Sequence, residues 1–335
     1  MAGTTQDAGH PGWRGFVVFT ILSLLLLGAI PLLSLATGAS MDFDAAGARA
    51  AADTGIAWTS NLLAVLRLCL VEPSLWLLVL GSAIPSFAGM LAASSQGRRS
   101  VQRLLARLIP WGAGASARGI AAAYLVPFAA LPVCLFATYA LRGLLPGPDY
   151  AQPENLIGPA FFSALLLSAL LDQGGVLEEL GWRGFAQQDA QTRLSSLAAA
   201  LLVGTVWGLW HIPRDVFAGV IERLGALQYT TLYLPSFLLG TITVSIVAAW
   251  CMNRAGGSVW PAIVVHGITN DALGIAGLAD INTALTPYHQ FTKAVPTLVL
   301  VVAFVWFSGR ELGMQPPQGP TPESAPRYPG TANPR

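Results

Sequence analysis

Three groups of polar side chains interrupt the apolar stretches between residues 170 and 275. In the first, Glu178 and Glu179 end an apolar run, and Arg183 follows four residues after the second carboxylate. On a helix, Glu179 and Arg183 share a face and can form an ion pair, whereas Glu178 points about 100° away and stays free. One neutralised and one free carboxylate form an arrangement that suits a general base. The alternative is an ordinary charge cluster at a helix end.

The other two groups contain histidines in otherwise uncharged stretches. His211 stands one turn after Trp207 in the segment WGLWHIP, and His266 precedes Asn270 by four residues, so the latter two share a helix face. Taken singly, these groups are also compatible with a hydrogen-bonded core histidine or a polar clamp between helices. Together, a carboxylate, two histidines and an amide on three helices predict a hydrolytic site, with a base for water and donors for an oxyanion.

The elements that hold these groups are expected to be membrane helices. Of the 335 residues, 54% are hydrophobic and 10% are charged, and the net charge is +1; an ordinary soluble domain has about 25% charged residues. This composition excludes a disordered chain and a nucleic-acid binder with a basic face. The three cysteines lie in apolar stretches at unrelated spacings, which indicates neither a disulfide framework nor a zinc ribbon.

Eight apolar stretches approach the roughly 20 residues that cross a hydrocarbon core. They are 15–37, 74–97 and 119–141, four stretches that begin near 157, 196, 230 and 258, and 294–308. Lipid offers no hydrogen-bond partner, and the stretches do not alternate as barrel strands do. We therefore predict an all-α transmembrane helix bundle of about eight spans. The segment 56–70, with Arg67 near its end, is expected to form an interfacial or partly buried helix outside this count.

The orientation follows from the loop after the second span, 94–118, which holds arginines and no acidic residue. These arginines are Arg98, Arg99, Arg103, Arg107 and Arg118. We expect this loop in the cytoplasm and, with an even number of spans, both termini there as well. The protein is then a multi-pass plasma-membrane protein whose basic helical stripe suits anionic lipid headgroups. The tails 1–12 and 313–335 are rich in Gly, Pro, Ser and Thr, and we expect them to be disordered.

The motifs resemble those of the CPBP family of intramembrane proteases, which includes the type II CAAX prenyl endopeptidases and the bacteriocin-processing or Abi proteins. The family's EExxxR motif, its aromatic residue four before a histidine and its HxxxN motif stand as EELGWRGF, WGLWHIP and HGITN, in the family's order. The aromatic position is Trp207, where many relatives have Phe. The resemblance covers 157–277 and divides the chain into a tail (1–12), N-terminal helices (13–156), a catalytic core (157–280), a last helix (281–312) and a tail (313–335).

The resemblance implies a role for each polar group. Glu178 and His211 would activate the water, and His266 and Asn270 would form the oxyanion hole. The supporting residues would be Glu179, Arg183 and Trp207. The family has been described both as metalloproteases and as metal-independent glutamate proteases, and Glu178, His211 and His266 could supply the three protein ligands of a catalytic zinc ion. Two separate pairs use all four groups without an ion, so we favour a site without a metal or other cofactor.

The depth of the site makes a further demand on the fold. Glu178 reaches the depth of the histidines only if the fourth helix continues through the EExxxR motif to about Gln188. The site is then expected in the inner half of the bilayer, open toward the cytoplasm and the lipid.

These expectations lead to an intramembrane endopeptidase that cuts a peptide or membrane-anchored protein near the cytoplasmic membrane surface. The alternatives are a proton-coupled transporter and a non-catalytic immunity or scaffold protein on the same fold. A single lysine, Lys293, among many arginines indicates a bacterial genome rich in GC. Because bacteria commonly lack prenylated proteins, peptide maturation or bacteriocin self-immunity is favoured over cleavage of a prenylated substrate.

Overall fold

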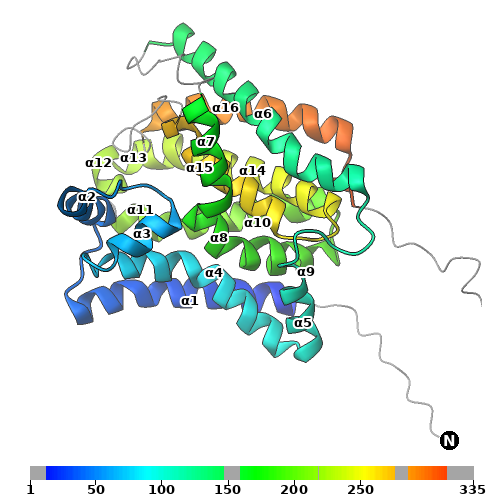
Figure 1. The fold of residues 1–335 in the computed structure, drawn as a ribbon, viewed down its shortest axis with the longest axis horizontal. Helices are drawn as coiled ribbons and strands as arrows, with labels where there is room; N and C mark the ends of the chain where they lie inside the picture. The colour runs from blue at the N-terminus through cyan, green and yellow to red at the C-terminus, as the bar shows by residue number, and fades with distance from the viewer. Residues whose placement is uncertain (1–12, 147–158, 218, 276–285, 315–335) are drawn as a thin grey trace, which may run out of the picture.

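The structure is a computed structural model that describes residues 13–146, 159–217, 219–275 and 286–314. Within these ranges the chain forms a bundle of helices, most of the long ones lying along one common direction (Figure 1). The described part contains no strand, only an isolated bridge between Asn61 and Asp172. The predicted all-α class is therefore confirmed. The predicted tail 1–12 and most of the tail 313–335 lie outside the described residues.

The first half of the chain forms six helices within the described residues. They are α1 (Arg14–Thr37), α2 (Phe43–Thr54), α3 (Leu62–Leu68), α4 (Leu75–Ser95), α5 (Arg98–Ala106) and α6 (Ala117–Leu144). The second half contains two π-helical segments, η2 (Leu180–Gln187) and η3 (Tyr229–Tyr233). Its α-helices are α7 (Pro159–Leu171), α8 (Gln173–Glu179), α9 (Gln188–Gln191), α10 (Ser196–Trp210), α11 (Ile212–Phe217), α12 (Val220–Leu224), α13 (Ala226–Gln228), α14 (Leu234–Arg254), α15 (Trp260–Ile275) and α16 (Pro287–Ser308).

Six of the described helical stretches are long and apolar enough to cross a membrane. They are α1, α4, α6, 196–217, 226–254 and α16, so the predicted helical membrane bundle is confirmed. The fourth and seventh expected spans correspond to α7 and α15, which have only 13 and 16 residues in the described part. In Figure 1, α7 runs at a steep angle to the long helices. The segment 56–70 contains the short helix α3, whose Leu68 packs with Ala50 of α2.

The two ends of the bundle differ in charge. We call one end the basic end; it contains α5, α9, the starts of α1 and α10 and the end of α14. Two hydrogen bonds hold these elements together: the amide of Phe16 donates to Asp189, and the amide of Leu197 donates to the carbonyl of Arg310. The arginines at this end are Arg14, Arg98, Arg99, Arg103, Arg107, Arg118, Arg193, Arg254 and Arg310. Asp189 and Glu311 are the acidic residues of the described chain there. The opposite end carries α2, α3, α11 and α12 (Figure 1).

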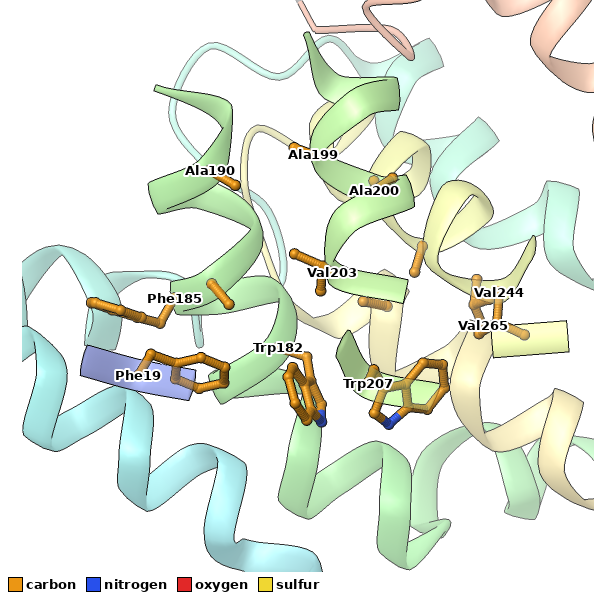
Figure 2. Close-up of a cluster of buried hydrophobic side chains, with 14 of the residues drawn as sticks. Phe19, Trp182, Phe185, Ala190, Ala199, Ala200, Val203, Trp207, Val244 and Val265 are labelled. Atoms are coloured by element: carbon orange, nitrogen blue, oxygen red, sulfur yellow. The ribbon is translucent and has the colours of Figure 1, made fainter. Parts of the chain in front are cut away.

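Aromatic and small side chains form the core between these ends. Figure 2 shows Phe19, Trp182 and Trp207 beside alanines and valines of α10, α14 and α15, all of them buried. A side chain at Gly181 would collide with the carbonyl of Pro85, and one at Gly204 would lie 2.7 Å from the Cα atom of Ile242. These glycines let η2 approach α4 and α10 approach α14 closely, as small residues do between membrane helices. The close packing holds the catalytic candidates on rigid helices.

Candidate active site

The helix that carries the paired carboxylates continues well beyond them. α8 passes into the π-helix η2 and then into α9, so helical structure extends to Gln191. The expectation that this helix runs through the EExxxR motif is confirmed, and it ends three residues later than predicted. At the other end the helix is interrupted: Asp172 has an extended backbone and separates α7 from α8, and its side chain caps the amide of Gly175. A π-helical segment of this kind is often found at functional sites.

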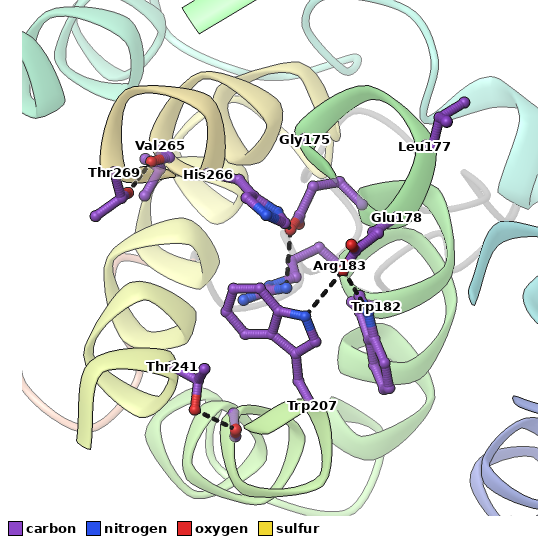
Figure 3. A network of polar contacts seen from close by, with 12 residues as sticks. Gly175, Leu177, Glu178, Trp182, Arg183, Trp207, Thr241, Val265, His266 and Thr269 are labelled. Carbon is purple, nitrogen blue, oxygen red and sulfur yellow. Dashed lines mark hydrogen bonds and ion pairs between the residues drawn. The ribbon is translucent and has the colours of Figure 1, made fainter. Parts of the chain in front are cut away.

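The predicted ion pair between Glu179 and Arg183 is present and fully buried. Nη1 of Arg183 lies 2.9 Å from Oε1 of Glu179, and both side chains are inaccessible to solvent. The same carboxylate oxygen lies 2.7 Å from Nδ1 of His266 on α15. Glu179 therefore connects two helices of the site; its partners Arg183 and His266 are labelled in Figure 3.

Glu178 is held by two indoles. Its Oε2 accepts hydrogen bonds from Nε1 of Trp207 at 2.9 Å and from Nε1 of Trp182 at 3.3 Å (Figure 3). The side chain is buried, and both contacts fall on one oxygen, so Oε1 keeps its lone pairs for another partner. A buried carboxylate with one oriented oxygen left over is a suitable acceptor for a proton from water.

Trp207 connects the two halves of the site. Its ring centroid lies 5.7 Å from that of His211 and 5.0 Å from that of His266, both in edge-on geometry. The guanidinium of Arg183 lies over the same indole, 4.4 Å from its centroid. The backbone carbonyl of Trp207 also lies 2.8 Å from Nδ1 of His211. Because a carbonyl can only accept, this nitrogen carries the proton and Nε2 of the neutral His211 ring keeps a lone pair.

His266 and Asn270 point at the same place beside α8. A Cβ atom at Gly174 would lie 2.8 Å from Nε2 of His266 and 3.2 Å from Nδ2 of Asn270. The two nitrogens thus lie within about 6 Å of each other. Donors of an oxyanion hole lie about 2.7–3.1 Å from the oxygen they stabilise. Two nitrogens at this separation can therefore donate to one oxygen placed between them.

Asp172 is a site residue that the sequence analysis missed. Its Oδ1 accepts from Nδ2 of Asn270 at 3.1 Å and from the amide of Gly175 at 2.6 Å, while its Oδ2 is buried without a hydrogen-bond partner among the described residues. The neighbouring Asp271 accepts from the hydroxyls of Ser60 and Ser168, which joins α7, α15 and the chain before α3. A carboxylate six residues before Glu178, in an otherwise uncharged run, was the available signal.

The structure places the site relative to its neighbouring helices. Gly181 packs on the carbonyl of Pro85, the central residue of α4. Glu178 lies nearly one turn beyond Gly181, away from the basic end, and His211 follows α10, about 22 Å from the start of that helix at the basic end. The expected location of the site in the inner half of the bilayer stays a prediction.

The start of α15 lies next to the basic loop. Val259, just before α15, packs against Gly184 in the middle of η2, with 3.1 Å between Cγ1 and the position of a Cβ at the glycine. The amide of Val259 donates to the carbonyl of Arg107 at 3.0 Å, and His266 follows about 10 Å further along the chain of α15.

The side chains that could have supplied zinc ligands are held by their neighbours. Nδ1 of His266 and Nδ1 of His211 are engaged by Glu179 and by the carbonyl of Trp207, and the ring of Trp207 stands against both imidazoles. Glu178 directs Oε2 to the two indoles. Throughout the described ranges, no three His, Cys, Asp or Glu side chains are grouped so that they could hold a metal ion.

Comparison with known proteins agrees with the motifs. Residues 159–271 match the family model described as type II CAAX prenyl endopeptidase Rce1-like. Over 131 residues, 39% of this chain, the sequence is 30% identical to a CAAX prenyl protease 2 from Methanococcus maripaludis. The match spans 44% of that relative, less than half of its length. The matched range contains all four catalytic candidates, and the resemblance predicted from the motifs is confirmed.

Proposed function

We propose that this protein is an intramembrane endopeptidase, because residues 159–271 match the Rce1-like family model of type II CAAX prenyl endopeptidases. Glu178 and His211 activate a water molecule, and His266 and Asn270 stabilise the oxyanion that forms when this water attacks a peptide carbonyl. No metal takes part in this scheme. The substrate is a peptide or a membrane-anchored protein, and the enzyme resides as a multi-pass protein in the cell membrane.

The observation that supports these roles best is the difference between the Nδ1 partners of the two histidines. His211 donates to a neutral carbonyl, which keeps Nε2 of a neutral ring as an acceptor for a water proton. His266 donates to the carboxylate of Glu179, which stabilises positive charge on the ring. When protonated, His266 donates from Nε2 toward the space beside Gly174. The structure thus favours one histidine as base and the other as donor.

The proposed reaction is a general-base hydrolysis. Water gives its proton to the Glu178/His211 pair as its oxygen bonds to the peptide carbonyl carbon, and the carbonyl electrons move onto the oxygen that faces His266 and Asn270. The intermediate then collapses: the carbon–nitrogen bond breaks, and the stored proton moves to the leaving amine. Arg183 stays paired with Glu179 throughout and holds that carboxylate against His266.

The experiment compares the termini of membrane proteins in cells that express the wild-type chain or Glu178→Gln. The matched control is Glu222→Gln, the same chemical change at an exposed position of α12. New termini should accumulate with the wild type and with Glu222→Gln but not with Glu178→Gln. Equal sets of termini in all three strains, with equal protein levels, would overturn the proposal.

A further inference from the structure

Asp172 fixes the orientation of the Asn270 amide. Its Oδ1 lies 3.1 Å from Nδ2 of Asn270. A carboxylate only accepts hydrogen bonds, so the NH2 group of the amide faces Asp172, and the second N–H of that group stays available for an oxyanion. An amide turned by 180° would place its oxygen against the carboxylate, where two acceptors would meet. The donor that the proposed mechanism takes from Asn270 therefore depends on the position of Asp172.

Asp172 is itself held by a segment from the first half of the chain. The amide of Gln173 donates to the carbonyl of Ser60 at 2.8 Å, and Asn61 forms the isolated antiparallel bridge with Asp172. These contacts join segment 59–61, just before α3, to the extended residue that separates α7 from α8. Segment 59–61 lies outside the range 159–271 that the family model matches.

The side chain of Ser60 reaches the residue next to Asn270. Its hydroxyl donates to Oδ2 of Asp271, and the same oxygen accepts from the hydroxyl of Ser168 in α7. Hydrogen bonds to an ionised carboxylate are among the stronger ones in proteins. Ser60 thus contacts two acidic segments of the site, that of Asp172 through its backbone and that of Asp271 through its side chain, and Asn270 is the neighbour of both.

Gly267 lets these groups pack in direct contact. A Cβ atom at this position would collide with the carbonyl of Ser168 and would lie 3.0 Å from Cβ of Asp172. α15 therefore lies directly on the end of α7, less than one turn before Asn270. Close-packed groups of this kind move together, so a change at Ser60 should alter the position of the Asn270 amide.

We propose that Ser60 is a positioning residue of the oxyanion hole and that segment 59–61, from the first half of the chain, completes the active site. Ser60 acts through Asp172 and Asp271 on the amide of Asn270. The inference rests on the proposed function, because it assigns Ser60 a part in that reaction. It adds to the site a segment that no motif of the matched range contains.

The test measures kcat, KM and thermal unfolding in detergent for the full chain with Ser60→Ala, Ser60→Thr or Ser94→Ala, on a substrate identified from the terminus comparison. Ser94→Ala is the matched control at an exposed position of α4. We expect Ser60→Ala to lower kcat about 5–50-fold. KM should stay nearly unchanged, because the oxyanion forms only as the reaction proceeds. Ser60→Thr keeps the hydroxyl and should recover much of the loss, and Ser94→Ala should match the wild type.

A double-mutant cycle with Asn270→Ala separates a positioning role from a general loss of structure. Because Ser60 acts through Asn270, adding Ser60→Ala to Asn270→Ala should lower kcat by less than about twofold. The same loss from Ser60→Ala in both backgrounds would overturn the inference. A kcat of Ser60→Ala within about twofold of Ser94→Ala would overturn it as well.

Two further variants keep the outcomes distinct. If Ser60→Ala does not fold, Ser60→Cys, which is close to serine in size but a weak donor, decides by the same criteria. Glu178→Gln, assayed beside these variants, tests the proposed function: activity that persists in it would refute the peptidase mechanism and this inference with it. Activity that is lost in Glu178→Gln but unchanged in Ser60→Ala would refute the role of Ser60 alone.

Discussion

Gly174→Ala should separate stability from catalysis in this protein. The new methyl carbon would lie 2.8 Å from Nε2 of His266, 3.2 Å from Nδ2 of Asn270 and 3.3 Å from Oδ1 of Asp172. A carbon this close would displace both nitrogens, which have to lie about 2.7–3.1 Å from an oxyanion to stabilise it. Loss of one such donor lowers kcat about 10²–10³-fold, so we expect a fall of at least that size.

The same change should cost little stability. Gly174 lies in a helix with an ordinary helical φ angle, where alanine is favoured over glycine by about 0.5–1 kcal/mol. This gain offsets part of the cost of moving the imidazole of His266, which would lie only 2.8 Å from the new carbon, and the amide of Asn270. The matched control is Gly81→Ala in α4, where a Cβ meets nothing within 4 Å and activity should not change.

The assay measures kcat and KM on a substrate identified from the terminus comparison, together with thermal unfolding in detergent. We expect Gly174→Ala to unfold within a few degrees of the wild type while kcat falls about a hundredfold or more. A folded Gly174→Ala protein whose kcat stays within about threefold of the wild type would refute the position assigned to the oxyanion hole.

Three further changes test the network around this position. Arg183→Met removes the partner of a buried carboxylate and should lower the free energy of unfolding by about 3–5 kcal/mol, which would appear as a lower folding yield. Glu179→Gln in the same chain should restore part of the yield, and no recovery would argue against the pair. Asp172→Ala should lower kcat about 5–150-fold with KM nearly unchanged, because Asn270 loses its hydrogen-bond acceptor. Asp172→Asn keeps an acceptor oxygen and should recover much of the loss in kcat. Equal loss in both variants would contradict a positioning role for Asp172. Exhaustive chelation, checked by elemental analysis, should leave activity intact, whereas full loss that stoichiometric zinc restores would refute the metal-free mechanism.

Hydropathy predicted most of the fold because the lipid-facing rule is local. Any long uncharged stretch must become a helix in a bilayer, and this rule identified the spans that α1, α4 and α6 form. It could not predict that α7 has only 13 residues and ends at Asp172. That interruption depends on a tertiary contact, in which the amide of Gln173 donates to the carbonyl of Ser60, more than a hundred residues earlier in the chain.

Motif spacing predicted the ion pair but not the groups that orient the site. Glu179 and Arg183 lie four residues apart on one helix, so their contact follows from helix geometry. The contact of Asp172 with Asn270 spans 98 residues and has no periodicity that the sequence could reveal. Gly174 offered even less, since the function of a missing side chain becomes visible only when the atoms around it are placed.

Trp207 shows how much of the mechanism depends on one side chain whose type the family pattern leaves open. Any aromatic ring at this position could stand between the imidazoles of His211 and His266 and beneath the guanidinium of Arg183. The indole of Trp207, unlike the phenyl ring of Phe, also donates to Oε2 of Glu178, at 2.9 Å. That bond directs the other carboxylate oxygen away from the indole and leaves it for water. In this chain the proposed base Glu178 is therefore oriented by the ring that also contacts His211, proposed to activate water, and His266, proposed to bind the oxyanion.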